Sequence, residues 1–236
     1  MSRKGCSLPP EADRAVAHGG RHPFDAGEDS LGATNAQRSI AGAGQRPGAR
    51  PISSDPRSQR SRQQILDAVH RQARRGEFTS ISSLSEAAGV TRATFYNHFD
   101  AIEVAAWFAI LDSFDDILER ALDERRHGIS FDIAGIESLR LIVEMLRSEP
   151  QLVRFADAYD NGSDLPGIVD IFRVQTGVIW ADSGKESAGA EVEITYAAAG
   201  LYAVLSIGAR GEGDPELIAR VAHAQLPAWM RQPDGG

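Results

Sequence analysis

Apolar residues recur at helical spacing over most of this chain. Their periodicity predicts long helices over about 58–75, 102–126, 132–148, 150–160, 165–181, 189–209 and 214–231. The breaks between these helices fall at glycine and proline, including Gly76, Gly128, Pro150 and the run 211–215. No segment alternates apolar and polar residues over several positions, as a half-buried strand would. The sequence therefore predicts an all-α fold.

A first short helix is predicted just after residue 79. Ser80 is suited to its N-cap, since a serine hydroxyl accepts a backbone N–H two or three residues further on. The apolar residues that follow share one helical face: Ile81, Leu84 and Ala88. Gly89 is expected to end the helix, because glycine adopts the left-handed backbone of a helix C-terminus without strain.

A second short helix is predicted to begin after Thr91, its N-cap. Phe95 and Phe99 lie on one side of this helix, which is expected to pack. The other side carries small or hydrogen-bonding side chains that suit phosphates and base edges: Arg92, Ala93, Thr94, Tyr96, Asn97 and, at its edge, His98. Two short helices joined by a glycine turn form a helix-turn-helix, whose second helix enters the major groove of DNA.

The segment 88–99, AGVTRATFYNHF, with a helix before it at about 59–75, resembles the DNA-binding domain of the TetR family of bacterial transcriptional regulators. The small-Gly-hydrophobic turn, the Thr cap, the aromatic pair and the closing His-aromatic pair carry this likeness in register. It is close over about residues 57–110 and only architectural beyond them. The resemblance implies a prokaryotic repressor that binds a palindromic DNA operator as a homodimer and releases it on binding a small ligand.

Within this interpretation, Arg92 and Thr94 are expected to read base edges, with Asn97 as a further reader. Phosphate contacts are expected from Ser80, Ser82, Thr91, Tyr96 and His98. One departure from the family lies just after the second helix, where members usually carry a Ser-Lys or similar pair whose lysine meets a phosphate. This chain has Asp100-Ala101-Ile102-Glu103 there, so one phosphate contact and its share of the salt-dependent affinity are expected to be missing.

Composition divides the chain into three regions. Residues 1–56 are rich in Gly, Pro, Ser, Ala and Arg and are expected to form a disordered extension, either an inert tail or an arm that touches DNA through Arg46, Arg50 and Arg57. Residues 57–102 are expected to form the helix-turn-helix DNA-binding domain. Residues 103–236 are expected to form a helical bundle for ligand binding and dimerisation.

Charge follows the same division. The formal net charge of −8 would argue against a nucleic-acid partner if it were spread evenly. Residues 57–99, however, carry seven basic and three acidic side chains, whereas residues 100–236 carry 11 and 24. A basic segment attached to an acidic one is typical of a DNA-binding protein with a separate regulatory domain, because only the first must approach phosphates.

The last two predicted helices, about 189–231, combine small residues such as Ala199, Gly200 and Ala203 with large apolar ones. In the family that this chain resembles, the two C-terminal helices pair with their mates across a two-fold axis. The same region is therefore our expected homodimer interface, with a purely internal core as the alternative.

The resemblance also implies an effector pocket inside the C-terminal bundle, for a small hydrophobic or aromatic molecule. Polar tips that can orient such a ligand belong to Tyr159, Trp180, Tyr196 and Tyr202. The other candidates are the large apolar residues of the bundle, most of which must simply be core: Trp107, Phe108, Leu111, Phe114, Met145, Phe155 and Phe172.

Little in the sequence favours other chemistry. We expect no catalytic residues, metal or cofactor, because no nucleophile elbow, His-Glu metal pair, Cys-x-x-Cys or dinucleotide loop is present. The acidic residues of 112–119 are interpreted as a solvated helix face. Cys6 is the only cysteine, which fits a reducing cytoplasm, and no apolar run of the ~18 residues needed to cross a membrane is expected. The alternative function is an all-α carrier or enzyme with an incidental helix-turn-helix.

Overall fold

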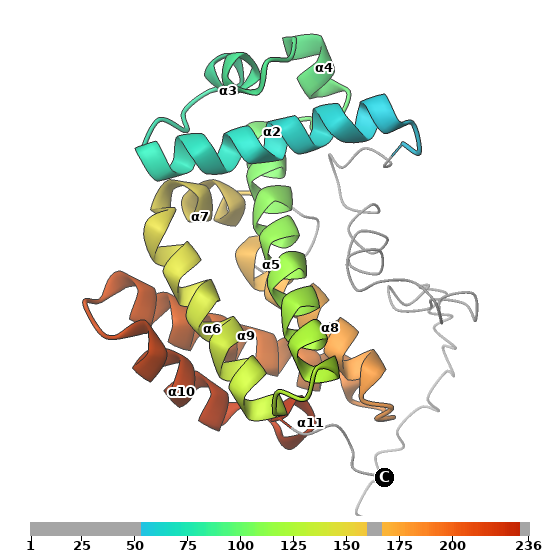
Figure 1. Cartoon of the computed structure of the whole chain (residues 1–236), viewed down its shortest axis with the longest axis vertical. Helices are drawn as coiled ribbons and strands as arrows, with labels where there is room; N and C mark the ends of the chain where they lie inside the picture. The colour runs from blue at the N-terminus through green and yellow to red at the C-terminus, as the bar shows by residue number, and fades with distance from the viewer. Residues whose placement is uncertain (1–52, 160–166, 232–236) are drawn as a thin grey trace, which may run out of the picture.

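The computed structural model describes residues 53–159 and 167–231, and its regular elements there are all α-helices (Figure 1). The all-α prediction is confirmed. The helices are α2 (Pro56–Arg75), α3 (Ile81–Ala88), α4 (Arg92–Tyr96), α5 (Ile102–Arg126), α6 (Phe131–Ser148), α7 (Pro150–Asp157), α8 (Gly167–Asp182), α9 (Ala190–Arg210), α10 (Pro215–Gln225) and α11 (Ala228–Arg231).

Helices α2–α4, which we call the head, lie together at one end of the molecule, with α2 across the top of α5 (Figure 1). The predicted apolar stripe of α2 packs against α3, α4 and the residues after α4. The head residues at this contact have no exposed surface: Ile65, Val69, Leu84, Phe95 and Phe99. Burial of such side chains stabilises a fold by about 1.5–3 kcal/mol each, so this contact holds the three head helices together.

Helices α5–α11 form the body, and α5 connects it to the head. The first half of α5 is buried on every side from Val104 to Leu111, because α2, α6, α7 and α8 all pack against it. One continuous hydrophobic cluster therefore runs from the head into the body. A displacement of α5 must carry the head with it, since tightly packed interiors transmit shifts rather than absorb them.

A buried polar cluster crosses the same boundary. The Glu149 carboxylate, between α6 and α7, accepts from Nδ1 of His70 at 2.6 Å and from the Arg74 guanidinium at 2.7 Å, both on α2. Nε2 of His70 lies 3.1 Å from the Ala109 carbonyl oxygen and 3.2 Å from the Ser113 hydroxyl, both on α5. This junction cluster ties α2 to two helices of the body at once.

Several predicted boundaries are wrong, including the end of the helix expected over 150–160, which stops at Asp157. The helix expected over 214–231 is broken into α10 and α11, because Pro227 cannot donate a backbone N–H and holds Leu226 extended at φ −63° and ψ 144°. Helix α4 ends at Tyr96, so Phe99 lies beyond it. Asp55 and Pro56, expected within the disordered extension, instead cap and begin α2. The rest of that extension, residues 1–52, lies outside the described residues.

Candidate nucleic-acid interface

The turn between α3 and α4 is built as the sequence predicts. Ser80 caps α3 by accepting the Ser83 N–H at 3.2 Å. Gly89 ends α3 with φ 68°, a left-handed conformation in which a side chain is strained, and Val90 donates back to the Ser85 carbonyl at 3.0 Å. Thr91 then caps α4 by accepting the Thr94 N–H at 3.0 Å. Both caps fix the angle at which α4 leaves α3.

The buried side of α4 is held by aromatic packing. Phe95 meets Phe99 with ring centroids 5.8 Å apart, and Phe99 meets Phe108 of α5 at 5.9 Å. The Arg62 guanidinium of α2 lies 4.6 Å from the Phe99 ring centroid and 4.5 Å from that of Phe108. Burial lowers the pKa of Arg62 to about 10, although the charge of Asp112 opposes this, so Arg62 remains charged at neutral pH. These contacts orient α4 with its other side outward.

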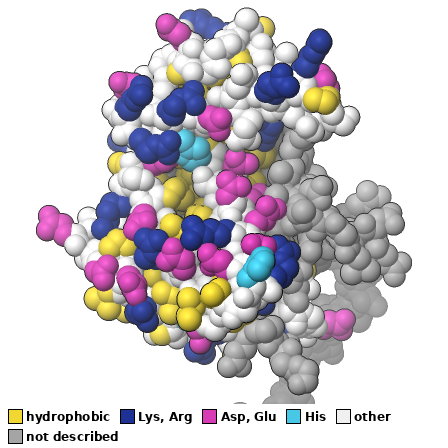
Figure 2. All heavy atoms as spheres, viewed as in Figure 1, with side chains coloured by type: hydrophobic (Ala, Val, Ile, Leu, Met, Phe, Trp, Pro, Cys, Tyr) yellow, Lys and Arg dark blue, Asp and Glu magenta, His cyan; other side chains and the backbone are white. Residues whose placement is uncertain are grey.

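The outward side of α4 carries most of the predicted DNA-contacting residues. Arg92, Ala93 and Asn97 are exposed, and Tyr96 keeps 47% of its surface in solvent. Ser80, Ser82 and Thr91, at the N-termini of α3 and α4, are exposed beside them. The Arg92 guanidinium donates to the Ser82 hydroxyl at 2.6 Å, which links the two helix starts. Figure 2 shows further Lys and Arg side chains over the head at the top of the molecule.

Two predicted contact residues lie elsewhere. His98 is buried, and its Nε2 lies 2.8 Å from the Ser61 hydroxyl of α2. Burial, and then the charge of Arg62, lowers the pKa of His98, so it is not placed as a cationic phosphate contact. The expectation of an outward His98 is wrong: the turn continues past Tyr96 through the backbone bonds of Asn97 and Phe99, and three residues after Phe95 the His98 ring lies on the packed side. The half-buried Thr94 hydroxyl pairs with that of Thr91 at 2.9 Å.

Two residues that brace the head were missed. The buried Gln72 amide of α2 donates to the carbonyl and hydroxyl oxygens of Ser83, at 3.1 and 2.8 Å. Arg71 donates to the Ala87 carbonyl at 3.0 Å and so satisfies the C-terminus of α3. Both residues are polar, and a helical-wheel analysis assigns polar residues to solvent. A polar residue within the apolar stripe of α2, as Gln72 is, was the available signal.

A cavity of about 280 Å³ lies in the body, between the second half of α5, α6, α8 and the chain's last helices. Its wall is mostly apolar and includes Ile117, Leu118, Leu139, Ile142, Val178 and Trp229. Space is left because α5 and α6 present small residues there, among them Ala121, Ala134, Gly135 and Ser138. Concave apolar sites of this kind bind small molecules. We call it the body cavity.

No family model, curated protein or solved structure matches this chain. Its function is therefore inferred from its own residues. In residues 53–159 and 167–231, no three His, Cys, Asp or Glu side chains are grouped so that they could hold a metal ion. Within the described residues, the outward face of α4 and the body cavity are two features that can carry a function.

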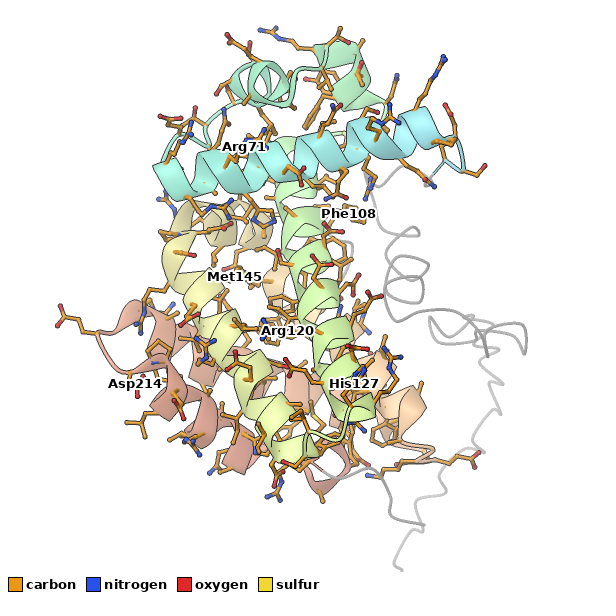
Figure 3. All side chains as sticks on the ribbon, viewed as in Figure 1. Arg71, Phe108, Arg120, His127, Met145 and Asp214 are labelled. Atoms are coloured by element: carbon orange, nitrogen blue, oxygen red, sulfur yellow. The ribbon has the colours of Figure 1, made fainter. Side chains whose placement is uncertain are left out.

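Most of the expected effector residues lie away from the body cavity. Of the eleven candidates only Phe114 and Phe172 line it. Figure 3 shows Phe108 near the head end of α5 and Met145 well along α6 towards the head. The other candidates pack elsewhere in the body or face solvent: Trp107, Leu111, Phe155, Tyr159, Trp180, Tyr196 and Tyr202.

Three of the residues chosen for their polar tips lie in surroundings other than the body cavity. Tyr202 donates to the Asp157 carboxylate at 3.2 Å, and burial, with the charge of Asp157, raises the pKa of Tyr202 to about 12. Trp180 packs edge-on against Trp229 with centroids 4.9 Å apart. Tyr196 keeps 79% of its surface exposed. Sequence reasoning favoured large aromatic residues, whereas the cavity arises where small residues face one another across helices.

An apolar surface remains open on α9 and α10. Val192, Tyr196 and Ile207 lie along one face of α9 and are each more than half exposed, and Leu217 and Val221 of α10 are exposed as well. In Figure 2 hydrophobic side chains gather at the lower left, over the region of α10. Helix α9 is also long and apolar enough, by length and composition, to cross a membrane. The sequence-based search missed this because it looked for an unbroken apolar run.

Proposed function

We propose that this protein is a DNA-binding transcriptional regulator of the TetR type, a repressor that binds a palindromic operator as a homodimer and is released by a small hydrophobic ligand. The observation that carries the proposal is the division of α4 into a buried side, Phe95, and an exposed side, Arg92, Tyr96 and Asn97. Capped short helices at a glycine turn, with such a face outward, suit a helix in the major groove.

The outward face defines the roles within this proposal. In the proposal Arg92 reads a base edge, since its planar guanidinium matches the acceptors of guanine. Asn97, on the same exposed face, is a further base-reading residue. Phosphates are held, and the register fixed, by Ser80, Ser82, Thr91 and Tyr96. The excess of basic residues in 57–99 supports the same contact.

The open surface of α9 and α10 supports a homodimer. A second copy would cover the apolar side chains on both helices, in line with the isologous contacts of most dimers. A membrane is a poorer partner for α9, because Ile194, Ala198 and Leu205 on its other side pack into the body. The proposal places the protein in the cytoplasm, where two α4 helices would enter successive major grooves about 34 Å apart.

The body cavity supports regulation by a ligand. Its wall includes Phe114, Ile117, Leu118 and Leu122 of α5, the same helix whose first half packs under the head. A ligand that shifts α5 would therefore move α4 relative to a second copy, a known route of switching. The cavity also fits the alternative function, a carrier, which would bind the ligand but no operator.

Replacing Arg92 with alanine is expected to lower affinity for the operator by about 5- to 150-fold, the value of 1–3 kcal/mol for a bidentate base contact. Affinity for unrelated DNA should fall far less, because only one basic side chain is lost. Both affinities can be measured by fluorescence anisotropy, with the intergenic DNA upstream of the gene for this protein as the operator source. Arg120→Ala, on the exposed side of α5, makes the same charge change and should leave both affinities unchanged. Equal losses on both DNAs would contradict a base-reading role.

A further inference from the structure

One end of the body cavity is basic, although its wall is apolar. Two cationic or titratable residues line it, Arg125 near the end of α5 and His223 of α10. They flank the start of α6: the Arg125 guanidinium lies 4.0 Å from the Phe131 ring centroid, and the His223 ring approaches Gly135 so closely that a β-carbon there would be 3.1 Å from Nε2. Gly135 thus leaves the room that the His223 ring occupies at the cavity wall.

His223 has an unused nitrogen at this place. The residue is 7% exposed, and among the described residues its Nε2 has no hydrogen-bond partner. The nearest acidic oxygen belongs to Asp132, 3.6 Å away and beyond hydrogen-bonding distance. A buried nitrogen without a partner costs about 1–3 kcal/mol, so a ligand group that pairs with it recovers that loss.

A second unused donor lies nearby. Arg231 of α11 has a buried Nε without a partner in the described part of the chain, and its charge acts on His223. Burial, with the charge of Arg231, lowers the pKa of His223, while the charge of Asp132 opposes this. Asp132 is 68% exposed, so water screens it more than it screens the buried groups. The positive charge at this end of the cavity therefore outweighs the screened charge of Asp132, which favours a ligand with a negatively charged group.

We propose that the body cavity binds a small amphipathic carboxylate, with its apolar part among the aliphatic wall residues and its carboxylate accepting a hydrogen bond from Nε2 of His223. Arg125 and Arg231 supply further positive charge. An apolar ligand without a polar group would leave the Nε2 atom unpaired, and a cation would meet the positive charges of Arg125 and Arg231. The role of this ligand as the effector of a regulator rests on the proposed function. Its binding to the cavity does not.

The test is calorimetric titration of the full chain with decanoate and with decan-1-ol, which share the same alkyl length. Decanoate is expected to bind at least about 10-fold more tightly, because only it offers an acceptor with full charge. His223→Leu keeps an apolar side chain of similar length and should reduce this preference while decanol binding stays. Equal affinities in the wild-type protein, or a preference that is undiminished in His223→Leu, would overturn the proposal.

A second measurement does not depend on a variant that folds. The ring nitrogen resonances of His223 in ¹⁵N-labelled wild-type protein should shift on addition of decanoate and stay in place with decanol; no shift with decanoate would overturn the proposal. Neither measurement contains DNA. If the protein binds decanoate at His223 but no operator, the proposed regulator is refuted and this inference stands. If it binds the operator but not decanoate at His223, this inference is refuted and the proposed regulator stands.

Discussion

Replacing Glu149 with alanine is expected to destabilise the protein by about 1–3 kcal/mol, the usual cost of leaving a buried hydrogen-bonding group without its partner. Glu149 is only 3% exposed and holds two side chains of α2 from the α6–α7 boundary. Its loss leaves His70 and Arg74 without their acceptor. The free energy of unfolding of a typical domain is only about 5–15 kcal/mol, so a loss of this size is a substantial fraction of it.

The measurement is urea unfolding followed by circular dichroism. Glu144→Ala, on the exposed side of α6, removes a carboxylate that pairs with Arg140 in solvent and should cost no more than about 1 kcal/mol. Similar losses in the two variants would show that the junction cluster does not hold the head to the body.

The pH dependence of the wild-type protein provides the signature of this cluster. Burial alone lowers the pKa of His70, but the hydrogen bond and charge of Glu149 outweigh it and raise this pKa above 6.5. A raised pKa stabilises the fold fully below the unfolded value, about 6.5, and this contribution is lost as pH rises through the folded value. The Glu149→Ala variant should not show this loss of stability as pH rises. If the loss remains in the variant, it belongs to a group other than His70.

Replacing Phe95 with alanine is the second large effect, about 3–5 kcal/mol of lost stability from an aromatic side chain with no exposed surface. Its ring packs against Phe99, and through Phe99 against Arg62 and Phe108. The cavity left behind lies where α2, α4 and α5 meet. The head is therefore expected to lose its fixed arrangement and operator binding together.

Tyr96→Ala is the matched control for Phe95→Ala, because the two aromatic residues are neighbours on α4 and only Phe95 is fully buried. Tyr96 is about half exposed, so its removal should change thermal and urea stability by less than about 1 kcal/mol. It should still weaken DNA binding, because Tyr96 is proposed as a phosphate contact. If Tyr96→Ala proved the more destabilising variant, the orientation of α4 would be the reverse of that described.

Local chemistry made the head predictable. A hydroxyl cap at Ser80, a left-handed glycine at Gly89 and a second cap at Thr91 are each determined by their immediate neighbours in sequence. The packed side of α4 could be predicted because Phe95 and Phe99 are four residues apart and so share one helical face. The error at His98 arose at the border between the two sides of the turn, where contact with Ser61 of α2 decides which way the ring lies.

The body cavity was not predictable in the same way. It depends on which helices pack, and on small residues such as Ala134 and Ser138 facing Ala121 across a gap. Periodicity identifies an apolar face but not the volume left between two faces. Likewise, the pairing of His70 with Glu149 joins residues 79 positions apart, and no local pattern links them. Such contacts follow only from the tertiary arrangement.

The central claim, sequence-specific DNA binding by α4 in a dimer, is tested most directly by hydroxyl-radical footprinting on the chain's own upstream intergenic DNA. The account predicts two protected segments related by a two-fold axis, about one helical turn or an in-phase multiple apart. Protection should survive unrelated competitor DNA and weaken steeply with salt. The absence of specific protection, in a sample that sedimentation shows to be a folded dimer, would contradict the account.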